Sequence, residues 1–352
     1  MPDTKVMLPS EPIYGLKAET TFGADMDANT NYLAQPVVQA EKPTFNIQRE
    51  SRLLSGRGGI KNSADTIVNT RGGTVTMPFD MIATPKTLLQ HAVLVAQQHS
   101  VSTNLNEIKI DGGNSTSIGG TITSGMPHSV NMAYKTTDGN GIQVGGMVCS
   151  DLTIAGDVGA NNGLVSVSGN YFSGFSNPVA GTLLEKSFGG TFVDPQTTYF
   201  NVMDFDTRTL DMDGSENSAF IMKSFSFNIA NGVNRVGFDT NGNAELYVFP
   251  EYVVTGSLVV KLDDNFDYSS GANVIQSFLN GDTLSLNMIC GDSEPNASGE
   301  MEITAEIQLT DDPAQDVSES GIFHTLNFEC VKSGSTPAFK LQVFESTALT
   351  AL

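Results

Sequence analysis

Apolar and polar residues alternate along several stretches of the chain, and this alternation is the clearest structural signal in the sequence. From Met301 to Leu309 every second residue is apolar, and the residues between them are polar. Residues 322–330 alternate in the same way, with Leu326, Phe328 and Cys330 on one side. Two further alternating sets are Ile221, Phe225, Phe227 and Ile229, and Val148, Leu152 and Ile154. A period of two predicts strands that bury one face.

Two segments instead show helical spacing. Thr84 can cap the first, Pro85 suits its first position, and its apolar stripe comprises Leu88, Leu89, Ala92, Val93 and Ala96. For the second, Ser269 or Ser270 is the expected cap, Asn280-Gly281 is the expected end, and the stripe comprises Val274, Ile275, Phe278 and Leu279. Each helix follows one strand and precedes several more. This order favours a mainly β fold with one helix packed on each of two antiparallel sheets.

An internal repeat divides the chain. Phe45-Asn46-Ile47 recurs as Phe227-Asn228-Ile229; a strand led by Gly73 follows the first after 28 residues, and one led by Gly256 follows the second after 29. An expected helix comes next in both copies. We therefore predict an N-terminal arm over residues 1–42 and two tandem β domains over residues 43–195 and 196–352, each with a long hairpin and one short helix.

The charge of the chain is strongly negative and uneven. The formal charge is −21, of which residues 199–352 carry −17 and residues 1–198 only −4. A polyanion of this kind repels phosphate, which argues against a surface that grips nucleic acid. The first hairpin is an exception, because Glu50 and Asp65 are outnumbered by Arg49, Arg52, Arg57, Lys61 and Arg71. These five basic residues either contact the acidic surface of another copy or belong to an ordinary solvated loop.

Patterns typical of catalysis are missing from the sequence. No G-x-S-x-G, H-E-x-x-H or P-loop sequence occurs, and the three cysteines, Cys149, Cys290 and Cys330, lack C-x-x-C spacing. We expect His91 and His99 to lie on the first helix, without acidic residues at ligand spacing, and His324 to face inward on a strand. The cysteine spacing suits a reducing compartment, and the sequence shows neither a signal peptide nor an apolar run of about 18 residues. We therefore predict no enzyme activity, cofactor, metal or membrane contact, and assembly in a cytoplasm.

Calcium is the remaining alternative for specific chemistry. Asp239, Asn241, Asn243 and Glu245 alternate along the chain, and four aspartates lie nearby at positions 204, 206, 211 and 213. Calcium prefers such oxygen ligands. However, the EF-hand spacing is absent, and the flanking strands favour a hairpin turn over a calcium site for residues 239–243.

An ordered series of segments resembles the tail tube (major tail) proteins of long-tailed bacteriophages. The segments are residues 73–79 with the helix after them, residues 135–139 leading into 146–154, residues 164–169, and residues 254–258 in the second half. The series covers about residues 43–345. No single piece is diagnostic, since hairpins with Asp-Gly turns are common; the order of the pieces carries the resemblance.

The resemblance implies a structural virion protein of a siphovirus-type phage. In such a tube each domain is a small β sandwich or barrel, and six domains join their sheets around a channel. Two domains per chain imply a homotrimer with pseudo-sixfold rings, with a hexamer as the alternative. Stacked rings would be bridged by the terminal arm and by the hairpin that carries Arg49, Arg52, Arg57, Lys61 and Arg71. The tape-measure protein, tail terminator or tip proteins, and double-stranded DNA passing an acidic bore are the implied partners.

A carbohydrate- or receptor-binding adhesin or fibre module is the alternative function. Modules of that kind stack sugars on exposed aromatic rings, and the chain has no Trp and eight Tyr, among which Tyr171 and Tyr199 are the residues to test. A hydrolase on a β scaffold lacks any supporting constellation.

Overall fold

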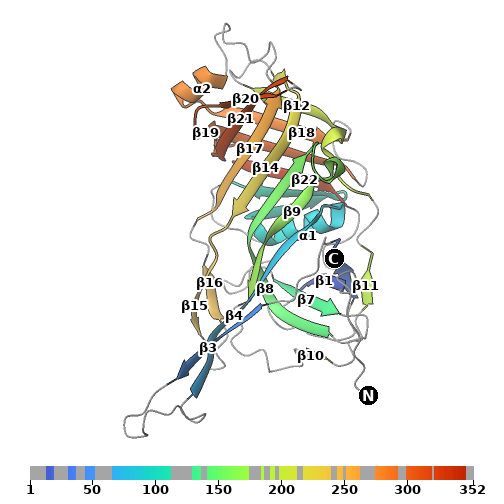
Figure 1. The fold of residues 1–352 in the computed structure, drawn as a ribbon, viewed down its shortest axis with the longest axis vertical. Helices are drawn as coiled ribbons and strands as arrows, with labels where there is room; N and C mark the ends of the chain where they lie inside the picture. The colour runs from blue at the N-terminus through green and yellow to red at the C-terminus, as the bar shows by residue number, and fades with distance from the viewer. Residues whose placement is uncertain are drawn as a thin grey trace.

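The structure, a computed structural model, describes residues 13–19, 31–36, 44–51, 66–111, 129–135, 141–173, 184–185, 191–194, 198–211, 217–238, 244–248, 251–261, 274–291, 299–318 and 321–345. Strands dominate these residues, and the two α-helices among them are α1 (Pro85–Val95) and α2 (Val274–Asn280). The prediction of a mainly β fold is therefore confirmed. Hydrogen bonds connect twenty of the strands into one network, within which two antiparallel sheets pack face to face (Figure 1).

The first sheet takes strands from both halves of the chain. Its order is β3 (Thr44–Ser51), β4 (Thr66–Ile82), β9 (Ser166–Ser173), β8 (Gly141–Asp157), β14 (Met222–Ala230), β17 (Val253–Lys261), β21 (Gly321–Cys330) and β20 (Ala314–Ser318). Strand β8 precedes residue 195, the predicted domain boundary, and β14 follows it. This sheet therefore continues across the boundary without a break, and the division into two domains stays a prediction.

The second sheet also combines the two halves. Its order is β5 (Gln98–Ser102), β6 (Leu105–Ile110), β22 (Phe339–Phe344), β19 (Met301–Leu309), β18 (Leu284–Cys290), β12 (Phe205–Asp211) and β13 (Asn217–Ala219). The last residues of β19 pair in addition with β21, which joins the two sheets along one side. β6 and β22 thus pair across the halves, as β8 and β14 do.

Aromatic rings fill the space between the sheets. Phe227 on β14 lies 5.5 Å from Phe328 on β21 and 5.4 Å from Phe339 on β22 of the opposite sheet, measured between ring centroids. Phe225 contacts Phe205 on β12 at 5.4 Å. All five rings are buried. Because large rings contribute most of the buried apolar area in a core, this cluster binds the two sheets together as one unit.

Residues within the predicted N-terminal arm form strands. β1 (Ile13–Ala18) pairs with β2 (Asn31–Ala34) and β7 (Val130–Lys135), and β7 pairs with the first part of β8. β11 (Thr191–Val193) runs parallel to β2, and β10 (Leu184–Glu185) lies on β8. Leu16 and Tyr32 are fully buried. The described parts of this segment therefore pack into the fold, and its other residues lie outside the described ranges.

Helix α1 begins and packs as its sequence predicts. The Thr84 hydroxyl accepts a hydrogen bond from the Thr87 amide at 3.2 Å, and the Thr87 hydroxyl accepts one from the Thr84 amide at 2.9 Å. This reciprocal capping box, followed by Pro85, fixes the first turn. Every residue of α1 except Lys86 is buried, against β8, β6 and β22. His99 lies on β5 rather than on the helix, because α1 ends at Val95.

Helix α2 is shorter and less covered than α1. Gly281 follows it with φ +68°, the left-handed conformation that ends helices, as predicted. Val274 is buried and Ile275 and Phe278 are half-buried, but Leu279 is 71% exposed. The predicted apolar stripe is therefore wrong at Leu279, and the expected caps Ser269 and Ser270 lie outside the described residues.

Glycine and phenylalanine face each other in both halves. Phe79 on β4 pairs with Gly169 on β9, and Gly256 on β17 pairs with Phe328 on β21. A Cβ atom at Gly169 would lie 2.9 Å from Cζ of Phe79, and one at Gly256 would lie 2.5 Å from Cζ of Phe328. Each ring therefore lies over its glycine, and packing rather than backbone conformation requires glycine at these two positions.

Hairpins project from the sheets in both halves (Figure 1). β3 and β4 form the first, with Phe45 opposite Val75. In the second half the chain continues from β14 into β15 (Asn234–Phe238) and returns through β16 (Ala244–Val248) to β17, with Phe227 opposite Gly256. The aligned Phe45 and Phe227 thus face positions 30 and 29 residues ahead. Position 75 lies two residues beyond Gly73, whereas Phe227 faces Gly256 itself, so the two hairpins differ in register.

Candidate assembly surface

The junction between β8 and β14 is where the two halves of the first sheet meet. Seven residues of each strand pair in order, from Ser224 opposite Asp157 to Ala230 opposite Asp151. The Asn228 side-chain amide donates a hydrogen bond of 2.8 Å to the Thr153 hydroxyl across this junction. We call it the internal seam. Alternation in the sequence identifies both strands, but no sequence pattern identifies their pairing.

The outward face of the first sheet bears small polar and acidic side chains. One row of cross-strand neighbours runs through Asp80, Ser168, Thr153, Asn228, Thr255 and Glu329. The next row runs through Ser166, Ala155, Ser226, Ser257 and Asn327. These two rows contain two carboxylates and no basic residue. Since both rows cross the internal seam, they form one continuous strip from β4 and β9 over β8, β14 and β17 to β21, which we call the smooth strip.

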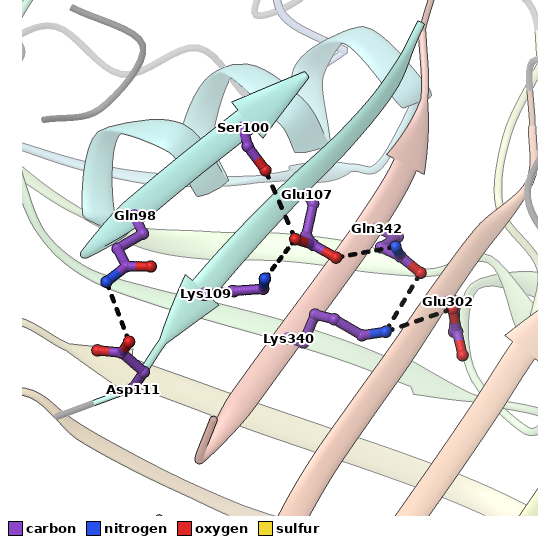
Figure 2. A network of polar contacts seen from close by, with 8 residues as sticks. All are labelled: Gln98, Ser100, Glu107, Lys109, Asp111, Glu302, Lys340 and Gln342. Carbon is purple, nitrogen blue, oxygen red and sulfur yellow. Dashed lines mark hydrogen bonds and ion pairs between the residues drawn. The ribbon is translucent and has the colours of Figure 1, made fainter. Parts of the chain in front are cut away.

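The outward face of the second sheet carries lysines within a network of polar contacts (Figure 2). Lys109 pairs with Glu107 at 2.5 Å, and Lys340 lies 3.8 Å from Glu302. The Gln342 side-chain amide donates to Glu107 at 3.1 Å, which links β22 to β6. These ion pairs are partly exposed, and each contributes little to stability on its own. They place positive charge on this face in a regular arrangement that the smooth strip lacks.

Basic residues of the first hairpin are only partly within the described ranges. Arg49 lies on β3 and Arg71 on β4, so the structure brings these two onto paired strands. Arg52, Arg57 and Lys61 lie outside the described residues. Their role as contacts between copies therefore stays a prediction.

A buried polar cluster surrounds His91 on α1. Its Nδ1 lies 2.6 Å from the Tyr171 hydroxyl, its Nε2 lies 3.1 Å from Oε1 of Gln35, and its ring stacks on Phe79 at 4.4 Å. Burial lowers the pKa of His91 to about 3, because the charged imidazolium cannot be solvated there. The cluster ties residue 35 of the N-terminal segment to α1 and β9. Tyr171 is fully buried, so it cannot stack on a sugar.

A second buried contact holds the N-terminal segment in place. Ser129 Oγ and the backbone amide of Gly146 both donate hydrogen bonds to the carboxylate of Glu19, the latter at 2.8 Å. Gly146 has φ +62°, and it lies where β8 passes from pairing with β7 to pairing with β9. The carboxylate therefore links β1 to this bend in β8. Nothing in the sequence pattern singles out Glu19.

Within the described ranges, cysteines and carboxylates form no reactive or metal-binding group. The three thiols are free and buried, and burial raises the pKa of Cys290 to about 12 and those of Cys149 and Cys330 further. No group of three potential metal ligands occurs among the described residues, which include Asp204, Asp206 and Asp211. The remaining calcium candidates, Asp213 and residues 239–243, lie outside these ranges, as does the side chain of Glu245. His324 is buried on β21, as predicted, and burial lowers its pKa.

None of the described helices is both long and apolar enough to cross a membrane. The family model for phage tail tube proteins matches residues 13–330, nearly the whole chain. The chain belongs to the phage tail tube protein family. It is therefore a structural tail protein, and membership implies that copies assemble into a tube and form part of a virion tail. A search of curated proteins found no match.

As a tail tube protein, the chain must present surfaces to other copies of itself. The internal seam, where β8 pairs with β14, shows how the edges of two strand groups meet within one chain.

Proposed function

We propose that three copies of this tail tube protein close into a ring by continuing the first sheet from chain to chain, and that rings stack into the tube of a siphovirus-type tail. The internal seam carries this proposal. It joins one four-strand group, β3, β4, β9 and β8, to a second, β14, β17, β21 and β20, edge to edge. Repeating that junction between chains is a head-to-tail contact, which closes into rings when the rotation allows.

Unpaired strand edges support the same reading. Among the described strands, none pairs with the outer side of β3 or of β20, the two ends of the first sheet. Exposed edges of this kind promote uncontrolled association unless they are covered. Ring closure would cover both. Two four-strand groups per chain favour three chains per ring, with a hexamer of chains as the alternative.

The smooth strip is the face that we assign to the bore. DNA is a polyanion, and lysines on a channel wall would bind its phosphates and slow its passage. The two rows of the smooth strip carry Asp80 and Glu329 but no basic residue. An acidic wall of short side chains lets double-stranded DNA pass during ejection without being held. The tape-measure protein would occupy the same bore before ejection.

Other contacts follow from this arrangement. The basic residues of the first hairpin, Arg49, Arg52, Arg57, Lys61 and Arg71, would contact copies in the next ring. Tail terminator and tip proteins would bind the two ends of the tube. Assembly would take place in the cytoplasm of the bacterial host.

Negative-stain electron microscopy of the concentrated protein, with averaging of end-on views, tests the proposal. We expect hollow cylinders whose end views show six lobes in three repeats. Six identical repeats built from six chains would favour the hexamer. A monodisperse monomer under every assembly condition would contradict self-assembly of this chain alone.

A further inference from the structure

A pocket of about 380 Å³ opens on the outward face of the second sheet. Its floor crosses four neighbouring strands, β6, β22, β19 and β18, and the turn that precedes β22 forms part of its rim. Small-molecule sites have volumes of about 300–1,000 Å³, so the pocket is large enough for a ligand. Polar and charged side chains dominate its lining, among them Lys109, Lys340, Thr304, Asn287 and Glu306.

Two of the lining residues are lysines that lie directly opposite each other, Lys109 on β6 and Lys340 on β22 (Figure 2). Like charges in this arrangement weaken a sheet unless other groups balance them. The Lys109 ammonium has a close partner, since it lies 2.5 Å from Glu107. The Lys340 ammonium is held more loosely, 3.8 Å from Glu302 and 3.4 Å from Oε1 of Gln342. It can therefore turn toward an anion in the pocket, which would also relieve the repulsion between the lysines.

The acidic side chains of the pocket already have donors. Glu107 accepts a hydrogen bond of 3.1 Å from Gln342 in addition to its contact with Lys109. The Ser285 hydroxyl donates to Glu306, and its oxygen lies 2.8 and 3.0 Å from the two carboxylate oxygens. An anionic group can therefore bind beside the lysines without taking a donor from either carboxylate.

Other lining groups can both donate and accept hydrogen bonds. Thr304 on β19 and Asn287 on β18 continue the cross-strand row that starts at Lys109 and Lys340. Oδ1 of Asn287 is buried and accepts no hydrogen bond from the described residues, although buried acceptors normally have a partner. A turn of this amide would present Oδ1 to a hydroxyl group in the pocket. Hydroxyl groups suit this wall because they donate to a carbonyl oxygen and accept from a threonine.

We propose that the pocket binds a sugar acid, which is a small ring that carries several hydroxyl groups and one carboxylate. The carboxylate would bind the ammonium groups of Lys340 and Lys109, and the hydroxyl groups would bind Thr304 and Asn287. Such a ligand occurs either as a free metabolite or as one unit of a glycan. The inference does not depend on the proposed ring, because the pocket lies within one chain.

Two observations restrict the ligand to this class. No aromatic residue is among the described residues that line the pocket, so a nucleobase or an aromatic acid would gain no stacking there. The chain has a formal charge of −21, which repels densely charged polymers more strongly than it repels a ligand with a single charge. A simple carboxylate without hydroxyl groups would leave most of the pocket unfilled and the wall of Thr304 and Asn287 unused.

Titrations followed by saturation-transfer difference NMR, with the full chain and four ligands, test the ligand class. The ligands are glucuronate, methyl glucuronoside, glucose and acetate. We expect glucuronate to bind at least about tenfold more tightly than glucose, which lacks the carboxylate, and than acetate, which lacks the hydroxyl groups. Methyl glucuronoside carries the linkage of a glycan unit. Binding of both sugar acids would indicate a glycan as the source, and binding of glucuronate alone would indicate a free metabolite.

Substitutions locate the ligand on the chain. K340Q removes the ammonium group and should weaken glucuronate binding about tenfold, whereas K340R keeps the charge and should change it less than about threefold. T304V removes one hydroxyl group and should weaken binding about threefold. K332Q is the matched control, because Lys332 is exposed and lies outside the pocket, and it should change binding less than about twofold. Circular dichroism melting verifies that each variant is folded.

Three outcomes would overturn this inference. Glucuronate that does not bind, or that binds no more tightly than acetate, would show that the pocket does not recognise a sugar acid. Binding that is unchanged in both K340Q and T304V would place the ligand elsewhere on the chain. Each of these results leaves the proposed function untouched, because tube formation is measured separately by electron microscopy.

Discussion

His91 links the stability of the fold to pH in a way that can be measured. The buried imidazole has its pKa lowered to about 3, whereas an unfolded histidine titrates near about 6.5. Below pH 6.5 the histidine therefore binds a proton in the unfolded chain but not in the folded chain. Stability from this group is complete above pH 6.5 and is lost as the pH falls toward 3, because the lower pKa belongs to the folded state.

The size of the effect follows from the two pKa values. Each pH unit between them costs about 1.4 kcal/mol, so moving from pH 8 to pH 5 costs about 2 kcal/mol, and reaching pH 3 costs about 5 kcal/mol. None of the groups that contact the ring, which are Tyr171, Gln35, Met81 and Phe79, titrates between pH 5 and pH 8. The expected effect therefore belongs to His91 alone.

Urea denaturation of the wild type and of H91Q at pH 8 and pH 5 measures it. Gln cannot be protonated, so the variant keeps a polar side chain but loses the proton linkage. We expect H91Q to be less stable than the wild type at pH 8 through lost packing, and this deficit to shrink by about 2 kcal/mol at pH 5. Carboxylates that titrate in both proteins cancel from the comparison. An equal deficit at both pH values would show that the wild-type imidazole is not held neutral, and the reasoning would fail.

Three other predictions concern packing, capping and thiol chemistry. G169A should lower the free energy of unfolding by about 1–3 kcal/mol, because its Cβ would lie 2.1 Å from the Asp151 carbonyl oxygen. The control G159A, whose Cβ would have no contact closer than 3.2 Å, should lower it by less than about 1 kcal/mol. Equal losses for the two variants in urea denaturation would contradict the packing argument. T84A should cost about 1 kcal/mol by removing the cap of α1 while T84S keeps most of the stability, and a T84S variant as unstable as T84A would show that the hydroxyl is not what matters. In the folded protein at pH 8 the three buried cysteines should resist a sulfhydryl reagent, since their raised pKa leaves almost no thiolate. In urea all three should react. Rapid labelling of the native protein would refute their burial.

Local features of the fold could be predicted from the sequence because they depend on neighbours along the chain. The alternation of Met301–Leu309 became β19, with every second residue buried as expected. The Thr84-Pro85 start of α1 was predictable for the same reason, since a cap needs only the residues of the next turn. In the strand predicted from Ile221 to Ile229, Ile221 itself is 50% exposed and lies just outside β14. Alternation locates strand interiors better than strand ends.

Features that depend on partners far along the chain were not predictable. β1 and β2 contain only short apolar runs around Leu16 and Tyr32, and their pairing with β7 and β11 carries no local signal. The exposure of Leu279 likewise depends on what covers α2, not on the helical spacing that predicts an apolar stripe. The internal seam is the largest such feature: both of its strands follow from alternation, but their union follows from packing of the whole sheet.

The internal seam also gives this chain a freedom that a ring of single identical units does not have. In such a ring every junction pairs the same two edges, so any substitution at an edge alters all junctions at once. Here the internal seam pairs β8 with β14 within one polypeptide. The outer edges of the first sheet are β3 and β20, whose sequences differ from those of β8 and β14. A substitution at the outer edges therefore leaves the seam unchanged. Under the proposed ring closure, the junction between chains can therefore evolve toward looser or tighter closure while the internal seam stays unchanged.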